Sequence, residues 1–136
     1  MPGYQKGRAK PLILYVDDSD KLLDIAELYL TSLGTDFLGA TTAEEGLSIA
    51  KKELPDVVLM DVVLPGMDGF EAVKNLKSDP ATKNIPVLMC TGSDGDSDIQ
   101  KGMAAGANGY ISKPIMRDRL QAKLQEWIQL PGEPAS

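Results

Sequence analysis

Short runs of consecutive apolar residues recur along the chain and predict strands that are buried on both faces. Residues 12–16, 57–60 and 86–90 lack the polar alternation of a strand with one face in water. Such runs are typical of a parallel sheet covered by helices. Residues 35–40 and 108–112 form weaker runs at the places where two further strands are expected.

The segment after the first run predicts an amphipathic helix. Ser19 or Asp20 can cap its first turn, and Gly34 stops it. Apolar residues recur between these limits at helical spacing, so we expect them to share one face. That predicted face consists of Leu22, Ile25, Ala26, Tyr29 and Leu33.

Two further helices have clear starting signals. Thr42 and Glu45 form a capping box for a helix that reaches about residue 53. Asp68 can cap a helix over residues 70–77, which ends before Pro80.

The C-terminal third predicts one weak helix and one better one. Residues 95–106 make a poor helix, because Gly95, Gly102 and Gly106 each cost about 1 kcal/mol relative to alanine. The last helix has an apolar stripe formed by Met116, Leu120, Leu124, Trp127 and Ile128.

Strands that alternate with helices predict an α/β fold with helices on both faces of a parallel sheet. For this length we expect a flavodoxin-like three-layer (βα)5 sandwich with strand order 2-1-3-4-5. Residues 11–130 form one domain in this prediction, and residues 1–10 and 131–136 are polar, flexible tails. Ligands of such folds bind where the first and third strands end.

Composition excludes several functions. The net charge is −6, which argues against direct nucleic-acid binding. The chain has no histidine, so it has no histidine-based catalysis or phosphohistidine of its own. The single Cys90 forms no internal disulfide and is expected to be buried. No apolar run approaches the roughly 18 residues of a membrane span, so we predict a cytoplasmic protein.

Candidate chemistry appears at the residues that follow the predicted strands. Asp17 and Asp18 follow the first strand, Asp61 the third, Thr91 the fourth and Lys113 the fifth. Two carboxylates 4 Å apart repel by about 4 kcal/mol at an effective dielectric near 20, so this cluster needs a cation or raised pKa values. Oxygen ligands on a rigid edge suit Mg²⁺.

Each of these residues also has an ordinary structural explanation. Asp17 and Asp18 could cap a helix, Asp61 could end a strand before a turn, and Lys113 could be a solvated lysine. The conjunction of all of them at one sheet edge favours a functional site.

At this point the sequence resembles the receiver domains of two-component response regulators. The resemblance rests on the pair Asp17-Asp18, on Asp61 in MDVVLPGMDG, on Thr91 in CTGS and on Lys113-Pro114 in GANGYISKP. It covers about residues 11–130.

The resemblance implies a phosphoryl-accepting role for Asp61. The donor would be a phosphohistidine on a sensor histidine kinase or a histidine phosphotransfer protein. Asp18 would be the main Mg²⁺ ligand, with Asp17 binding through water, Asp61 itself and the backbone carbonyl of Val63 completing the protein ligands. Mn²⁺ could substitute for Mg²⁺.

The resemblance also implies a switch. Lys113 would pair with phosphoryl oxygens, aimed by a cis peptide bond to Pro114, and the Thr91 hydroxyl would turn toward the phosphoryl group. Tyr110 would then swing inward and change the surface of the fourth helix (residues 95–106), the fifth strand (residues 108–112) and the last helix. That surface would control an unknown downstream protein or a missing output domain. A second copy of the chain could also bind there, which would give a homodimer on phosphorylation. Such a chain is no enzyme beyond its own phosphorylation and dephosphorylation.

Two positions beside the site carry a further hypothesis. Val63 follows Asp61 by two residues and Ser93 follows Thr91 by two, and neither is a good base or amide. We therefore expect slow self-dephosphorylation, with Val63 shielding the acyl phosphate.

Two other functions use related folds. A Mg²⁺-dependent phosphohydrolase with an aspartyl nucleophile commonly has an Asp-x-Asp pair after its first strand, whereas Asp17 and Asp18 are adjacent. A flavin carrier needs a Ser/Thr/Gly-rich phosphate loop there, and the loop reads Asp-Asp-Ser-Asp from Asp17. The sequence leaves open whether the chain acts alone or belongs to a longer protein.

Overall fold

Five parallel strands form the central sheet of the computed structural model, which describes residues 4–92 and 96–131. The sheet order is β2-β1-β3-β4-β5, which confirms the predicted topology. In the register, Ile13 of β1 lies opposite Phe37 of β2 and Val57 of β3. The bounds are β1 (Leu12–Val16), β2 (Asp36–Ala40), β3 (Val57–Asp61), β4 (Val87–Thr91) and β5 (Gly109–Ser112).

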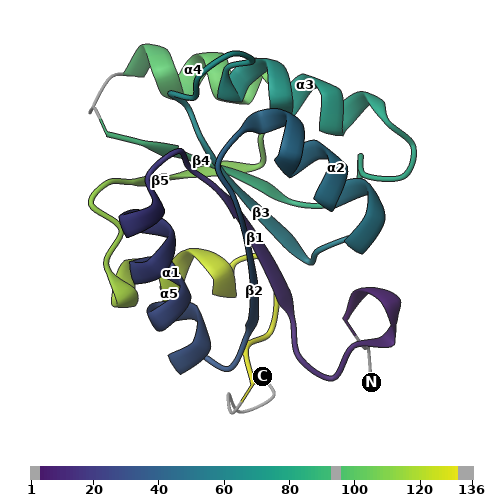
Figure 1. The fold of residues 1–136 in the computed structure, drawn as a ribbon, viewed down its shortest axis with the longest axis vertical. Helices are drawn as coiled ribbons and strands as arrows, with labels where there is room; N and C mark the ends of the chain where they lie inside the picture. The colour runs from purple at the N-terminus through teal and green to yellow at the C-terminus, as the bar shows by residue number, and fades with distance from the viewer. Residues whose placement is uncertain (1–3, 93–95, 132–136) are drawn as a thin grey trace.

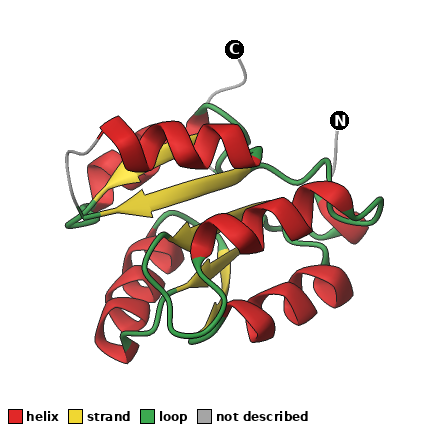
Figure 2. Ribbon diagram, turned by 90° about the horizontal axis from the view of Figure 1, so that it is seen from above, coloured by secondary structure: helices red, strands yellow, loops and turns green. Residues whose placement is uncertain are grey.

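Helices cover both faces of this sheet (Figures 1 and 2). They form one layer on each face (Figure 1). Among the described residues, none of the helices has the length and apolarity that crossing a bilayer requires. The first layer consists of α1 (Asp20–Ser32) and α5 (Arg117–Gln125), and the second of α2 (Ala43–Glu53), α3 (Gly69–Ser78) and α4 (Asp96–Ala105).

The strands are apolar throughout because their successive side chains enter two different cores. In β1, Leu14 and Val16 pack with the α2–α4 layer, whereas Ile13 and Tyr15 pack with the α1–α5 layer. All five residues of β1, of β3 and of β4 are buried.

The predicted helix starts are present as side-chain caps. The Ser19 hydroxyl accepts a hydrogen bond from the Leu22 amide at 3.2 Å, and the Asp68 carboxylate accepts one from Glu71 at 2.8 Å. The Thr42 hydroxyl accepts one from the Glu45 amide at 3.1 Å. The Glu45 carboxylate in turn accepts from Thr41 rather than from Thr42 itself.

The expected packing face of α1 is confirmed at Ala26 and Leu33 but wrong at Leu22 and Ile25. The side chains that meet the sheet are Leu23, Ala26, Leu30 and Leu33, whereas Ile25 is 37% exposed. One residue turns a helix by about 100°, so the stripe that begins at Leu22 lies beside the sheet-facing stripe. It faces the start of α5 instead.

The weak helix forms, and one of its glycines has a packing reason. A side chain at Gly102 of α4 would begin 2.8 Å from the Met89 side chain of β4, so the glycine lets the helix lie close to the sheet. Gly106 has φ +112°, a conformation suited to glycine after a helix end. Gly95 lies outside the described residues.

The last helix is shorter than its apolar stripe. Leu120 and Leu124 are fully buried, but α5 ends at Gln125. Met116 precedes the helix with 52% of its surface exposed, and Trp127 follows it with 38% exposed. Ile128 packs against the core from beyond the helix end.

Residues 4–10, which their composition places in a flexible tail, make specific contacts. Gln5–Gly7 forms a 3₁₀ turn whose first amide donates to Asp56 at 2.7 Å. The Arg8 guanidinium donates to the carbonyls of Glu53 at 2.9 Å and Leu54 at 2.6 Å, at the end of α2. These carbonyls are acceptors that a helix end leaves unsatisfied.

Candidate functional site

The carboxyl ends of the strands bring together the residues selected from the sequence. Asp17 directly follows β1, Asp61 ends β3, Thr91 ends β4 and Lys113 directly follows β5. Because the strands are parallel, these ends meet at one edge of the sheet.

Lys113 connects two of the carboxylates. Its ammonium nitrogen lies 3.0 Å from Oδ2 of Asp17 and 3.1 Å from Oδ2 of Asp61. The side chains of Asp17 and Asp61 are 1% and 5% exposed, and that of Lys113 is 20% exposed. Burial alone would lower the pKa of the Lys113 ammonium, but its bonds to both carboxylates outweigh burial and raise it. Lys113 therefore stays protonated between the two acids.

Asp17 is held by three other groups as well as by burial in the sheet edge. Its Oδ1 accepts a hydrogen bond from the Ser19 amide at 2.9 Å. Its Oδ2 accepts one from the Tyr15 hydroxyl at 2.7 Å, in addition to the Lys113 contact. Burial, together with the negative charges nearby, raises the pKa of Tyr15, so its hydroxyl remains a donor. Sequence reasoning missed Tyr15, whose only signal was a hydroxyl within a buried strand.

The two carboxylate oxygens of Asp61 have different partners: Oδ2 contacts the Lys113 ammonium, and Oδ1 contacts a backbone amide. Its Oδ1 accepts a hydrogen bond from the Val63 amide at 3.2 Å. Burial raises the pKa of the Asp61 carboxyl above its ordinary value of 3.8, although Lys113 and the Val63 amide oppose this rise. The charge of Asp17 adds to it. Burial at the end of β3 therefore disfavours the charged form of Asp61.

Gly69 also shapes this site and was missed from the sequence. It begins α3, and its amide donates to the Val62 carbonyl at 3.4 Å. A side chain at Gly69 would collide with the backbone carbonyl oxygen of Asp61. The absence of a side chain lets the loop after β3 fold back onto the strand that carries Asp61.

The acidic cluster has the donors for a divalent metal ion. One carboxylate oxygen from each of Asp17, Asp18 and Asp61 lies within 4.8 Å of the others, and Asp18 is exposed. With Lys113 as the neighbouring cation, two negative charges in this group remain uncompensated. Oxygen ligands and this residual charge fit Mg²⁺.

The remaining predicted residues surround this cluster. Thr91 is 2% exposed, and its carbonyl accepts a hydrogen bond from the Lys113 amide at 2.8 Å. The Lys113–Pro114 peptide bond is cis. Tyr110 is half-buried on the edge strand β5, and Val63 is 73% exposed. Ser93 lies outside the described residues.

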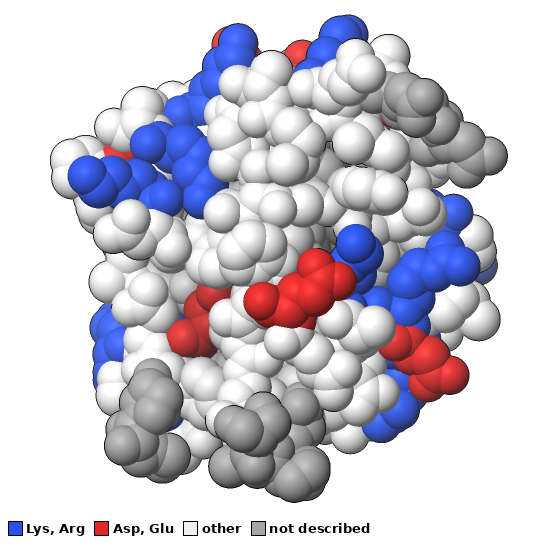
Figure 3. All heavy atoms as spheres, turned by 180° about the vertical axis from the view of Figure 1, so that it is seen from behind, with Lys and Arg blue, Asp and Glu red and all other residues white. Residues whose placement is uncertain are grey.

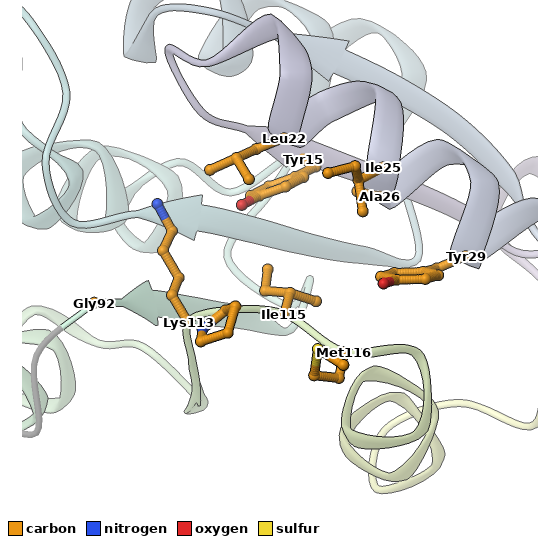
Figure 4. A pocket seen from close by; sticks show the side chains of 10 residues that line it. Tyr15, Leu22, Ile25, Ala26, Tyr29, Gly92, Lys113, Ile115 and Met116 are labelled. Atoms are coloured by element: carbon orange, nitrogen blue, oxygen red, sulfur yellow. The ribbon is translucent and has the colours of Figure 1, made fainter.

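A largely apolar pocket of about 450 Å³ adjoins the site. The stripe of α1 that begins at Leu22 forms one wall, through Leu22, Ile25 and Tyr29. Ile115 and Met116 face them from the segment before α5, and Lys113 extends along the pocket's edge (Figure 4). The pocket thus joins the acidic cluster to the surface between α1 and α5.

Comparison with known proteins agrees with this arrangement. The response regulator PleD of Caulobacter vibrioides is 41% identical over 106 residues, which cover 76% of this chain and 23% of PleD. The protein PilH of Pseudomonas aeruginosa is 39% identical over 108 residues, covering 79% of this chain and 89% of PilH. The chain therefore spans less than a quarter of one relative and most of the other.

A solved structure extends the likeness to the fold. The receiver domain of the sensor histidine kinase PA1611 from Pseudomonas aeruginosa PAO1 aligns with a TM-score of 0.81 and 29% identity. The alignment covers 88% of this chain and 98% of that one, and that structure has a magnesium ion coordinated in its active-site cleft. The family model for the response regulator receiver domain matches residues 13–125, from β1 to the end of α5. This chain therefore belongs to the response regulator receiver domains of two-component signalling.

Proposed function

We propose that Asp61 accepts a phosphoryl group from a phosphohistidine on a sensor histidine kinase or a histidine phosphotransfer protein. A carboxylate oxygen of Asp61 attacks phosphorus, the phosphorus–nitrogen bond breaks, and its electron pair leaves with the imidazole nitrogen. The product is an acyl phosphate on Asp61. The observation that carries this proposal is the buried Asp61 carboxylate, 3.1 Å from the Lys113 ammonium and beside two further carboxylates.

Lys113 has a role before and after transfer. Before it, the ammonium pairs with both Asp17 and Asp61. Phosphorylation converts the Asp61 carboxylate into an acyl phosphate and introduces phosphoryl oxygens nearby, so Lys113 exchanges one anionic partner for another. The Thr91 hydroxyl, at the end of the adjacent strand β4, turns toward the same oxygens.

Mg²⁺ fits the acidic cluster, and Mn²⁺ could take its place. When bound, the ion neutralises and positions phosphoryl oxygens during an in-line transfer. Asp18, Asp61 and the backbone carbonyl of Val63 would hold it, with Asp17 binding through water. Asp18 is the exposed member of the cluster, which supports its assignment as the main ligand. The magnesium ion in the PA1611 receiver supports it too.

The pocket between α1 and the start of α5 supports a protein phosphodonor. It adjoins Lys113, and its walls are mainly apolar side chains, among them Ile25 and Met116 with 37% and 52% of their surface exposed. A donor that packs apolar side chains there would place its phosphohistidine near Asp61 (Figure 4).

The output is a change in the surface of α4, β5 and α5. Phosphorylation would shift an equilibrium between two conformations of Thr91 and Tyr110. The partner is an unknown downstream protein or an output domain outside this chain, and a phosphorylation-dependent homodimer is one form it can take. On the face shown in Figure 3, basic groups gather in separate places with uncharged and acidic surface between them, which supports a protein target over nucleic acid.

The remaining parts of the proposal follow from this role. Residues 11–130 form the receiver unit. It catalyses only its own phosphorylation and dephosphorylation, so we expect no turnover of small phosphate substrates and no flavin colour. We place it in the cytoplasm, where a buried free thiol such as Cys90 stays reduced.

Intact mass after incubation with acetyl phosphate tests the phosphoacceptor. The wild-type protein should gain one phosphoryl group with Mg²⁺ and none after the metal is chelated. Asp61→Asn should gain none, whereas Asp118→Asn, which changes a carboxylate that is 98% exposed and outside the acidic cluster, should behave like the wild type. A gain by Asp61→Asn would assign the phosphate to another residue.

A further inference from the structure

Tyr110 has a cationic neighbour on a different element. The ammonium nitrogen of Lys123 in α5 lies 4.9 Å from the centroid of the Tyr110 ring. This separation is within the range in which a cation is attracted to the face of an aromatic ring. The contact therefore links the edge strand β5 to α5 through a side chain that the proposed switch requires to move.

The Lys123 ammonium has one weak acidic partner within the described part of the chain. This partner is Glu126, whose Oε2 lies 3.9 Å away and whose side chain is 56% exposed, so the ion pair is weak. The Lys123 side chain is 29% exposed, so its ammonium is partly removed from water. Tyr110 also packs against the core beneath α4, so its ring is held from two sides.

The sheet register shows that inward movement of the Tyr110 ring would break its contact with Lys123. Tyr110 lies opposite Met89 and Ser112 lies opposite Thr91, so Tyr110 and Thr91 project from the same face of the sheet, offset along the strand direction. A ring that moves toward Thr91 moves along this face and away from α5. It must leave the Lys123 ammonium behind.

We infer that Lys123 is a positioning residue that holds Tyr110 in its half-exposed position and so opposes the switch. This inference rests on the proposed function, in which Tyr110 moves inward when Thr91 turns. A partly solvated cation–π contact corresponds to a factor of about two to five in an equilibrium constant at room temperature. Loss of the contact should therefore populate the inward position about two to five times more.

The test compares the rate at which acetyl phosphate and Mg²⁺ phosphorylate matched variants, followed by intact mass. Lys123→Met keeps the aliphatic stem and removes the charge, and should react about two- to fivefold faster than wild type. Lys123→Arg keeps a cation that stacks on aromatic rings, and should react at the wild-type rate. Lys123→Gln serves as a second neutral variant, and thermal unfolding checks that each variant is folded.

The same substitutions in two backgrounds separate the ring contact from a general effect on α5. In Tyr110→Phe, which keeps the ring, Lys123→Met should still accelerate phosphorylation. In Tyr110→Leu, which lacks the ring, it should have no effect. The inference is overturned if Lys123→Met leaves the wild-type rate unchanged or lowers it, or if its effect survives in Tyr110→Leu. A wild-type protein that takes up no phosphoryl group overturns the proposed function and this inference together.

Discussion

The hydroxyl of Tyr15 donates a 2.7 Å hydrogen bond to Oδ2 of Asp17 from within the sheet. The same oxygen contacts the Lys113 ammonium at 3.0 Å. Tyr15 is 1% exposed, so this hydrogen bond is made without competition from bulk water. A residue of the buried core thus fixes the position of one member of the acidic cluster.

Tyr15→Phe should therefore destabilise the protein and weaken the metal site. A hydrogen bond to a charged group contributes about 1.5–3 kcal/mol, and Asp17 would keep only Ser19 and Lys113 as partners. We expect the free energy of unfolding to fall by about 1–2 kcal/mol. Urea unfolding measures this change, and calorimetric titration should show a lower affinity for Mg²⁺.

Tyr29→Phe is the control for that substitution, because Tyr29 lines the neighbouring pocket and is not a partner of Asp17. Equal stability of Tyr15→Phe and Tyr29→Phe would show that the Tyr15 hydroxyl contributes nothing to the fold.

Asp61→Asn should stabilise the fold near neutral pH. The pKa of Asp61 is raised in the folded protein, chiefly by burial, so folding favours its protonated form. Such a group contributes most to folding stability below the pKa that it has in the unfolded chain. This contribution is lost as the pH rises through the pKa that it has in the folded protein. We expect a gain on the order of 1 kcal/mol near neutral pH that shrinks toward about pH 4.

Urea unfolding of wild type and Asp61→Asn across this pH range measures the difference, with Asp118→Asn as the exposed control. A gain that grows as the pH falls would contradict a raised pKa for Asp61 in the folded protein.

Much of the fold was predictable because a strand that is buried on both faces is a run of consecutive apolar residues. The runs in β1, β3 and β4 carry no alternation, and the topology followed from their separation by helices. The site was predictable for a related reason: Asp17, Asp61 and Lys113 are polar residues at the ends of such runs, and parallel strands bring their ends together.

What the sequence did not reveal depends on contacts that form only in the folded chain. Arg8 has the composition of a tail residue, and only the folded chain brings it to the end of α2. The stripe that begins at Leu22 is apolar but lies beside a pocket, so periodicity alone did not distinguish it from the stripe through Leu23. Gly69 carries no side-chain signal, and its role depends on a backbone contact with Asp61.

Val63→Asn should accelerate loss of the phosphoryl group from Asp61. Val63 is 73% exposed, and its amide is already bonded to Asp61, which keeps it beside the acyl phosphate. An amide at this position can orient a water molecule for attack, whereas the valine side chain can only exclude it. We expect decay that is severalfold faster, measured by intact mass after removal of the phosphodonor.

Leu28→Asn makes the same kind of change at a side chain that is 72% exposed on α1, and should decay like the wild type. Unchanged decay in Val63→Asn would mean that another group controls access of water.

Arg8→Ala should lower stability, although it lies in a segment with the composition of a tail. The guanidinium donates to the carbonyls of Glu53 and Leu54 at the end of α2 and lies 3.5 Å from Oδ2 of Asp56. The Asp56 carboxylate is 6% exposed, so loss of Arg8 removes a compensating charge as well as two hydrogen bonds. We expect the free energy of unfolding to fall by about 1–2 kcal/mol, measured by urea titration.

Lys10→Ala is the matched control, because it removes a nearby positive charge but none of these contacts. If both variants unfold like the wild type, residues 4–10 lie against α2 without stabilising it. If only Arg8→Ala is destabilised, the N-terminal segment is part of the folded unit, and its anchor is the pair formed by Arg8 and Asp56.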